Sequence, residues 1–558
     1  MGAGSVTGRT PGQPSGQPSK LSSWKLAPPH DTQTQGIVVS GFSDLPSAQA
    51  LFLMCDWPDE PAAAGPARKG AWLQALTAVA PITDSDGKDE NAASIAFTWT
   101  GLRKSGLDPN ALASFSAPFR EGMYQEDRLR RLGDRIKDKW QCTVIKDGPQ
   151  WSGNTPVKDD RPPVAMRLPG GKTAPARRPQ RQVTTPLTVH ALLLLYHQDA
   201  EEVQKWADKV ATALAPHNVK IVHRLALDLH LDKAKNVARE HFGFADGLSQ
   251  PIPFDAEDGG EEGTVVVDGK PAPRDPWHGV PLGEILLGHT NAHAEKSPGP
   301  LVLEDTDPLD GRERDLKPDG APEGFLNLGL NGSYMVVREL RQYVGKFWKS
   351  LEDNAERIRA HDPTATYVTA DWLAERLVGR SLDGDMLCPA GMRPAGPGNL
   401  PDNAFGYIAD DRYGQGCPMG SHVRRANPRD GLAKDHPAAA QTLLDAANNH
   451  RILRRGRKFG ALPKDRHEDD GEERGLLFIC LNADIARQFE FVQQTWILNP
   501  NFATLYDETD PLVGPEGRFT IGEQPLRRIV EVETFIQSAG GEYFFLPSLP
   551  ALKYLASL

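Results

Sequence analysis

An apolar segment followed at once by an amphipathic one is the feature that most limits how this chain can fold. Residues 188–196, TVHALLLLY, form a nearly uninterrupted apolar run of strand length. From Ala200 onward, Val203, Trp206, Val210 and Leu214 recur at the three-and-four spacing of one buried helix face. A buried strand that leads directly into a helix predicts a sheet with helices packed on it.

The same alternation recurs along the chain. We expect a helix capped by Asp108 and a helix over 485–495. The other expected strands are 36–42, 94–99, 284–287, 332–337, 475–481 and the terminal YFFLPSL, and the other expected helices are 45–55 and 340–351. Strand-helix-strand-strand patterns of this kind are typical of an α+β fold with an antiparallel sheet, and two such halves would fill 558 residues.

Two stretches interrupt this pattern. The first twenty residues are rich in Gly, Pro and Gln, and we predict a disordered tail over 1–35. Proline, glycine and arginine crowd 146–182, which we interpret as an irregular insertion. Its GGKT is not a phosphate-binding loop, because Met166 replaces the first glycine that such a loop needs. We therefore predict an N-terminal half over 36–250, with the insertion at 146–182, and a C-terminal half over 251–558.

Charge and cysteine content restrict the partners. Asp and Glu total 74 against 63 Lys and Arg, a net charge of −11 that argues against nucleic acid. No apolar run is long enough to span a membrane, and the start of the chain lacks the apolar core of a secretory signal. The five cysteines are scattered without any CxxC pair, which indicates reduced thiols and a cytoplasmic protein. No CxxCH is present for covalent haem attachment.

The stretch from Cys417 to Gly460 carries the densest chemical signal. It reads CPMGSHVRRANPRD and later HRILRRGRKFG, so His422 is followed by Arg424, Arg425 and Arg429. A neutral imidazole beside guanidinium groups could ligate a metal while the arginines hold carboxylates. Haem needs both an axial nitrogen and partners for its propionates. A surface loop with a satisfied histidine is the simpler alternative for His422 alone.

A second signal is EHFGFADGLSQP, residues 240–251. Asp246 lies among Phe242, Gly243, Phe244 and Gly247, where tight backbone turns allow close approach to a flat ligand. A carboxylate among phenylalanines is partly desolvated and suited to proton transfer. An Asp-Gly turn without chemistry is the alternative.

Two further stretches supply candidates. Arg454 follows the apolar Ile452-Leu453 pair and could stabilise developing negative charge, unless it is one of several surface arginines. In LLFICLNADIARQFEF, Leu476 and Phe478 alternate on one strand face and could line an apolar pocket. Asp484 is either a helix N-cap or the acceptor of the Nδ1 hydrogen of His422.

Together these stretches resemble the dye-decolourising peroxidase family of haem enzymes. GFADG is similar to the family's GxxDG motif, SHVRRANPR to its proximal-histidine segment and HRILRRGRKFG to its distal-arginine segment. Further similarity covers GEILLGHTN, NGSYMVVRELRQYVGKFW, the strand near 476 and both ends of the region 35–558. The family's Tyr-Gly is Phe459-Gly460 here, and the spacing leaves Arg455 as an alternative to Arg454.

The resemblance implies a fold of two ferredoxin-like halves that enclose a non-covalent haem b. His422 would be the proximal iron ligand, oriented by Asp484, and Arg429 would meet a propionate. Asp246 would be the distal acid/base, Arg454 its partner, and Leu476 and Phe478 the distal wall. The implied activity is reduction of hydrogen peroxide and one-electron oxidation of phenols and dyes, with an acidic optimum and possible oligomers. A haem-binding or haem-handling protein with little turnover, and a haem-free scaffold, are the alternatives.

Overall fold

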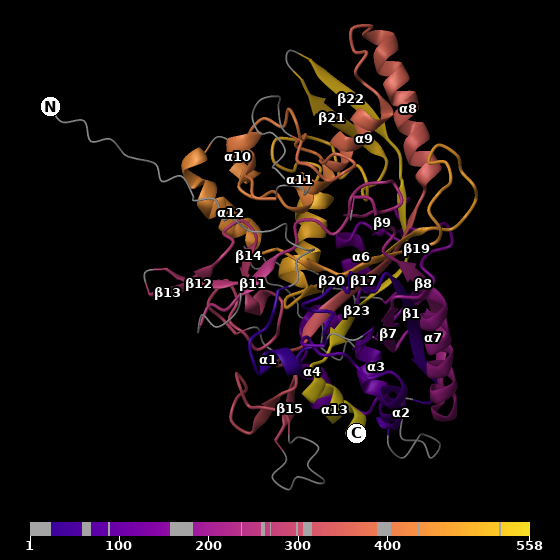
Figure 1. Cartoon of the computed structure of the whole chain (residues 1–558), viewed down its shortest axis with the longest axis vertical. Coiled ribbons are helices and arrows are strands. Elements are labelled where there is room, and N and C mark those ends of the chain that lie inside the picture. The colour runs from indigo at the N-terminus through magenta and orange to yellow at the C-terminus, as the bar shows by residue number, and fades with distance from the viewer. Residues whose placement is uncertain are drawn as a thin grey trace, which may run out of the picture.

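The computed structural model describes residues 24–558 apart from 59–68, 88–89, 157–181, 236, 258–262, 268, 297–298, 305–314, 388–402, 434–435 and 524–525. Two units with the same element order build its centre (Figure 1). The N-terminal unit comprises β1 (Ser47–Cys55), α2 (Ala71–Val79), β2 (Asn91–Phe97), β7 (Ala191–His197), α7 (Ala200–Leu214) and β8 (Val219–Asp228). The C-terminal unit comprises β17 (Ser333–Gln342), α8 (Val344–His361), β19 (Arg457–Phe459), β20 (Gly475–Asn482), the π-helical η6 (Ala486–Glu490) and η7 (Val492–Ile497), and β23 (Ile536–Leu546).

Each unit is a ferredoxin-like sheet. The strand orders are β8-β1-β7-β2 and β19-β20-β17-β23, which place the first and third strands of each unit at the centre. Within each unit the neighbouring strands are antiparallel. The units join at β8–β19 and at β2–β23, so among the described residues these strands close into a ring. The α+β fold with two ferredoxin-like halves is confirmed.

Both faces of the ring are buried. One apolar cluster, which includes Phe52, Leu194, Val337 and Ile479, fills the face that the ring encloses. Helices α2 and α7 cover the outer face of the N-terminal unit, and α7 runs alongside β1, β7 and β8 in Figure 1. Strands buried on both sides show continuous rather than alternating apolar sequence.

The remaining elements connect or cover these units. Between β2 and β7 lie α3 (Trp99–Lys104), α4 (Pro109–Ser114), α5 (Ala117–Glu121), α6 (Glu126–Arg131), β3 (Arg135–Ile136), β4 (Lys139–Trp140), β5 (Trp151–Ser152) and β6 (Leu187–Thr188). The units are connected through β9 (Leu231–Asp232), β10 (Val237–Ala238), β11 (Ile252–Phe254), β12 (Thr264–Val267), β13 (Lys270–Pro273), β14 (Gly279–Pro281), β15 (Leu301–Leu303) and β16 (Phe325–Asn327). The C-terminal unit adds α9 (Ala370–Val378), α10 (Tyr407–Asp410), α11 (His422–Ala426), α12 (Ala440–Asn448), β18 (Leu453–Arg454), β21 (Gly517–Gly522), β22 (Arg527–Val532) and α13 (Leu549–Ser557).

The first expected strand and helix are wrong. Residues 36–42 form turns rather than a strand, and residues 47–55 of the expected helix form β1. Ile37, Val38 and Val39 are apolar because they pack within the core that the ring encloses. The periodicity of a short apolar run cannot separate a doubly buried strand from a buried helix. The strand expected at 284–287 is also wrong. A 3-10 turn over Leu282–Glu284 continues into further turns at these residues.

The predicted tail and insertion are shorter than expected where the structure describes them. Trp24 and Leu26 are buried, and α1 (His30–Gln33) follows them, so residues 24–35 belong to the folded body. Trp151–Ser152 of the predicted insertion forms β5 beside β23. The remainder, residues 1–23 and 157–181 with GGKT, lies outside the described residues. The boundary predicted at 250/251 falls in the connection between β8 and β17.

Candidate active site

A cavity of about 330 Å³ adjoins the outer face of the C-terminal sheet. Leu340 of β17 and two residues of β20 line it from the sheet, while α11 and η7 contribute His422 and Ile497. Of the residues predicted from the sequence, the cavity is lined by Asp246, His422, Arg429, Arg454, Leu476 and Phe478. These residues span more than 230 positions of sequence, and the fold brings them to one hollow. Asp484 does not line it.

His422 begins the short helix α11, with Ser421 before it in extended backbone. Its Nδ1 lies 2.9 Å from Oδ2 of Asp510, a fully buried carboxylate. Burial raises the pKa of Asp510, but the charge and hydrogen bond of His422 and the amide of Val513 hold that pKa below its ordinary value. An ionised Asp510 accepts the Nδ1 hydrogen, which leaves Nε2 as the nitrogen available to a metal.

The prediction that Asp484 orients His422 is wrong. Oδ1 of Asp484 instead accepts a hydrogen bond from the backbone amide of Arg487 at 3.0 Å. Oδ2 of Asp484 lies 3.7 Å from Nε of the Arg487 side chain. This is the helix-capping alternative that its position allowed. Asp510 lies 88 residues beyond His422 in a turn of its own, where Oδ1 accepts from the amides of Leu512 and Val513. In the sequence only that turn was recognisable, because nothing local links Asp510 to a histidine.

Asp246 is held through both of its oxygens. Oδ1 accepts from the amide of Gly247 at 2.6 Å, and Oδ2 lies 2.9 Å from Nζ of Lys458. Burial alone would raise the pKa of Asp246, but the charges of Lys458 and Arg454 lower it to about 2. The carboxylate is therefore ionised even in acid. Sequence reasoning missed Lys458, which stands in a basic run that resembles a solvated surface.

The structure distinguishes Arg454 from Arg455. Arg454 lines the cavity, and its Nη2 donates to the carbonyl of Leu248, two residues beyond Asp246. Arg455 lies on the other side of the strand, where it donates to the carbonyls of Ile37 and Val38. Arg454 is therefore the cavity residue, as the sequence predicted.

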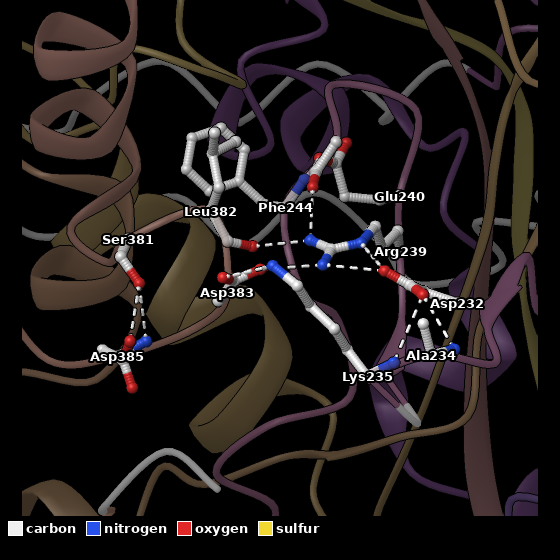
Figure 2. A network of polar contacts seen from close by, with 11 residues as sticks. Asp232, Ala234, Lys235, Arg239, Glu240, Phe244, Ser381, Leu382, Asp383 and Asp385 are labelled. Atoms are coloured by element: carbon white, nitrogen blue, oxygen red, sulfur yellow. Dashed lines mark hydrogen bonds and ion pairs between the residues drawn. The ribbon is translucent and has the colours of Figure 1, made fainter. Parts of the chain in front are cut away.

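The loop that carries Asp246 is fixed by a network of charged groups (Figure 2). Arg239 donates to the carbonyls of Gly243 and Leu382 and pairs with Asp232 and Asp383. Lys235 lies between the same regions and pairs with Asp383 at 2.6 Å. Arg239 thereby ties the loop 239–247 to the β9–β10 turn and to residues 381–385, which restricts the position of Asp246. The Lys235–Asp383 pair is about half exposed and joins that turn to residue 383 at the edge of this network.

Five arginines line the same cavity: Arg338 pairs with Asp134, and the other four, Arg380, Arg429, Arg451 and Arg454, form an arginine cluster. Burial and the charge of Arg429 and Arg454 lower the pKa of Arg451 to about 9, and burial lowers that of Arg429 to about 10. Among the residues that the structure describes, buried Nη1 of Arg451 has no hydrogen-bond partner. Arg429 donates to backbone carbonyls and to Ser249 Oγ. Clustered buried guanidiniums with an unused donor fit a ligand that carries carboxylates.

The rest of the cavity suits a flat apolar molecule. Leu476 and Phe478 contribute apolar side chains beside others such as Val378, Phe489 and Leu512. Within the described ranges, no group of three or more His, Cys, Asp or Glu side chains gathers to hold a bare metal ion. Two imidazoles line the cavity, but the ring of His450 stacks on Phe491 and its Nδ1 contacts the carbonyl of Arg487. The imidazole of His422, the apolar walls and the arginine cluster therefore fit haem, which brings four further nitrogen ligands and two propionates.

His422, backed by the buried carboxylate of Asp510, shares this cavity with ionised Asp246 and with Arg454. These features are typical of the class of haem peroxidases.

Comparison with known proteins agrees with that class. The chain is 32% identical over 390 residues to the multifunctional dye peroxidase DyP2 of Amycolatopsis sp., covering 66% of this chain and 71% of that protein. It is 28% identical to the dye-decolorizing peroxidase msp1 of Mycetinis scorodonius, covering 66% of each chain. No protein-family profile matches. The chain belongs to the dye-decolourising peroxidase family, whose members are hydrogen-peroxide-dependent oxidoreductases.

Solved structures share the fold. The DyP-type peroxidase of Anabaena sp. superposes with a TM-score of 0.63 at 22% identity, covering 94% of both chains. The DyP2 structure from Amycolatopsis sp. gives a TM-score of 0.61 at 23% identity, covering 97% of this chain and all of that one. Among the described residues, no helix combines the length and apolar character that crossing a membrane requires.

Proposed function

We propose that this peroxidase holds a non-covalent haem b in the cavity of His422, reduces hydrogen peroxide there and oxidises small aromatic reductants such as phenols and dyes. Bound haem supplies the iron at which peroxide is reduced and through which single electrons leave the reductant. The observation that carries the proposal is that His422, Asp246, Arg454 and the arginine cluster line a single cavity.

The protein contributes at two places. His422 Nε2 would ligate the haem iron, and ionised Asp510 would fix the ring and raise its basicity. Arg429, with Arg451 beside it, is proposed to meet the propionates, because Arg451 retains an unused buried donor. Leu476 and Phe478 exclude water from the distal side.

Asp246 and Arg454 are proposed to carry the peroxide chemistry. Ionised Asp246 accepts a proton from one peroxide oxygen and returns it to the other, which leaves as water. Arg454 donates hydrogen bonds to the negative charge that develops as the O–O bond breaks. A protein that only stores or transfers haem needs no such pair, which disfavours the haem-handling alternative.

Substitutions at the two residues test this assignment. We expect Asp246→Asn and Arg454→Leu each to slow single-turnover reaction with peroxide by about 10²-fold or more, measured by stopped-flow absorbance. Asp208→Asn, in an exposed ion pair with Arg224 on α7, is the control and should leave the rate unchanged. A larger loss in Arg454→Leu than in Asp246→Asn would make Arg454 the dominant distal group. Purified protein that lacks a Soret band after expression with adequate iron would contradict the haem assignment.

The pH dependence follows from Asp246. Because its pKa is lowered to about 2, the base form persists at acidity that protonates a free histidine. We therefore expect turnover of dye substrates to persist as the pH falls toward about 3, which allows an acidic optimum, measured as turnover against pH. Loss of the single-turnover rate with peroxide between about pH 6 and 4 would contradict Asp246 as the base.

We also propose a reducing compartment such as the cytoplasm. Among the described residues, Cys55, Cys142, Cys417 and Cys480 are free thiols, which supports such a compartment. Association of copies into oligomers is compatible with the sequence.

A further inference from the structure

Lys458 is a buried lysine that the proposed reaction does not use. It lies in β19, which pairs with β20 on one side and with β8 on the other, and only 1% of its side chain is exposed. Its Nζ reaches Asp246 Oδ2 at 2.9 Å and the carbonyl of Leu229 at 3.3 Å. A lysine that is buried this fully is found in proteins where a carboxylate pairs with its ammonium group.

Strand alternation explains this placement. On β19, Phe459 packs in the core that the ring encloses, and Arg457 donates to the carbonyls of Leu45 and Pro46 beside that core. Lys458 therefore points to the other face, toward the loop that carries Asp246.

Other charged groups near the pair do not replace the ammonium. Arg454 on β18 also acts on Asp246, and Glu240 faces it from the same loop. Asp228, His230 and His241 surround Lys458. Burial lowers the pKa of His230 and takes that of His241 to about 4, which disfavours the charged form of both rings at neutral pH. Lys458 is the cation that contacts the carboxylate directly.

We propose that Lys458 is a positioning residue of the peroxide reaction, whose ammonium fixes Oδ2 of Asp246 and supplies the positive charge that this partly buried carboxylate needs as an anion. With Oδ1 held by the amide of Gly247, both oxygens have set positions. The inference rests on the proposed role of Asp246 as the base. Without the ammonium, burial favours the neutral acid, and the base is lost at a higher pH.

The test compares the haem-loaded wild type with Lys458→Met, which keeps the length and removes the charge, and with Lys458→Arg, which keeps the charge. Infrared difference spectra against pH report the protonated carboxyl of residue 246, identified by its disappearance in Asp246→Asn. The matched control is Lys235→Met, which breaks a lysine–aspartate pair with Asp383 in the same region (Figure 2). Stopped-flow rates with peroxide are measured over the same pH range.

In the wild type, Lys458→Arg and Lys235→Met, we expect no protonated carboxyl down to about pH 3. In Lys458→Met the carboxyl signal should titrate at or above the ordinary aspartate value of about 3.9. The rate with peroxide should then fall about fivefold or more at pH 3.5 and stay within about twofold at pH 7. If Lys458→Met does not fold, Lys458→Gln serves for the same measurement.

An unchanged carboxyl titration in the charge-removing variant would overturn the inference. So would an equal shift in Lys235→Met, because the effect would then be one of net charge. A shifted carboxyl signal with an unshifted rate profile would support the pairing and overturn the role of Asp246 as the base. Failure of the proposed role of Lys458 can therefore be distinguished from failure of Asp246 as the base.

Discussion

At the scale of single residues, the site depends on which carboxylate meets which cation. His422 was recognisable from its Gly-Ser turn and basic neighbours, and Asp246 from its aromatic and glycine setting. Their partners were not. Asp510 and Lys458 contact them at 2.9 Å from elements that follow 88 and more than 200 residues later. A side-chain pair of that kind has no periodicity or motif that a sequence reveals.

The Asp510 contact gives a prediction. Asp510→Asn removes the charge that orients His422, and we expect the iron reduction potential to rise and haem affinity to fall about 10- to 100-fold. The measurement is spectroelectrochemical titration together with haem transfer to apomyoglobin. Asp484→Asn is the control and should change neither, because Asp484 caps a helix. An equal effect of the two substitutions would restore Asp484 as the partner.

The same contact predicts how acid releases haem. The pKa of Asp510 is lowered in the folded protein, so its ionised form, and the hydrogen bond to His422, persist as pH falls until that lowered value is reached. Loss of the Soret band on acidification should therefore shift to higher pH in Asp510→Asn, followed by absorbance. Equal acid sensitivity of the variant and the wild type would contradict this role.

At the scale of elements, the strands β18 and β19 set the positions of Arg454 and Lys458. Arg455 and Arg457 insert into the turn region 37–46 and donate to its carbonyls, while Arg454 and Lys458 face the site. The apolar run GIVVSGF thus serves as a buried acceptor for these arginines, which is why its strand-like composition forms turns. Sequence periodicity reports apolar character but not whether a backbone carbonyl is needed elsewhere.

Arg457 tests this arrangement. Its guanidinium donates to the carbonyls of Gly41, Phe42, Leu45 and Pro46, so Arg457→Met leaves these acceptors buried without it. We expect the free energy of unfolding to fall by about 3 kcal/mol or more, measured by urea titration of the haem-loaded protein. Arg518→Met, at an exposed position of β21, should change it by less than about 0.5 kcal/mol. Similar losses in both variants would contradict a specific anchoring role.

At the scale of the whole molecule, two ferredoxin-like units close into one ring, and buried ion pairs link them across the cavity wall. Asp134, which follows α6 between β2 and β7, pairs with Arg338 of β17, and both side chains are at least 92% buried. Nη2 of Arg338 lies 2.6 Å from Oδ1 and 2.8 Å from Oδ2 of Asp134. Since both residues also line the cavity, the junction of the units and the site share this pair.

Breaking the pair should weaken the whole fold. Asp134→Ala leaves a buried guanidinium uncompensated, and we expect the free energy of unfolding to fall by about 3–5 kcal/mol in guanidinium titrations. Asp127→Ala, which removes a half-exposed partner of Arg130, is the matched control and should cost less than about 0.5 kcal/mol. A small effect of Asp134→Ala would show that the ring closes without this pair.

The sequence by itself determined the fold class, the family and six residues of the cavity lining, because each depends on local patterns: apolar periodicity, Gly-rich turns and short motifs. It misassigned β1 as a helix and residues 36–42 as a strand, since the periodicity of a short, largely apolar run does not separate these states. It named Asp484 where Asp510 contacts His422, and it did not find Lys458. Only the tertiary structure decided these points, because ring closure and burial bring distant charges into contact, and the energy of an ion pair depends on the distance in space and not along the chain.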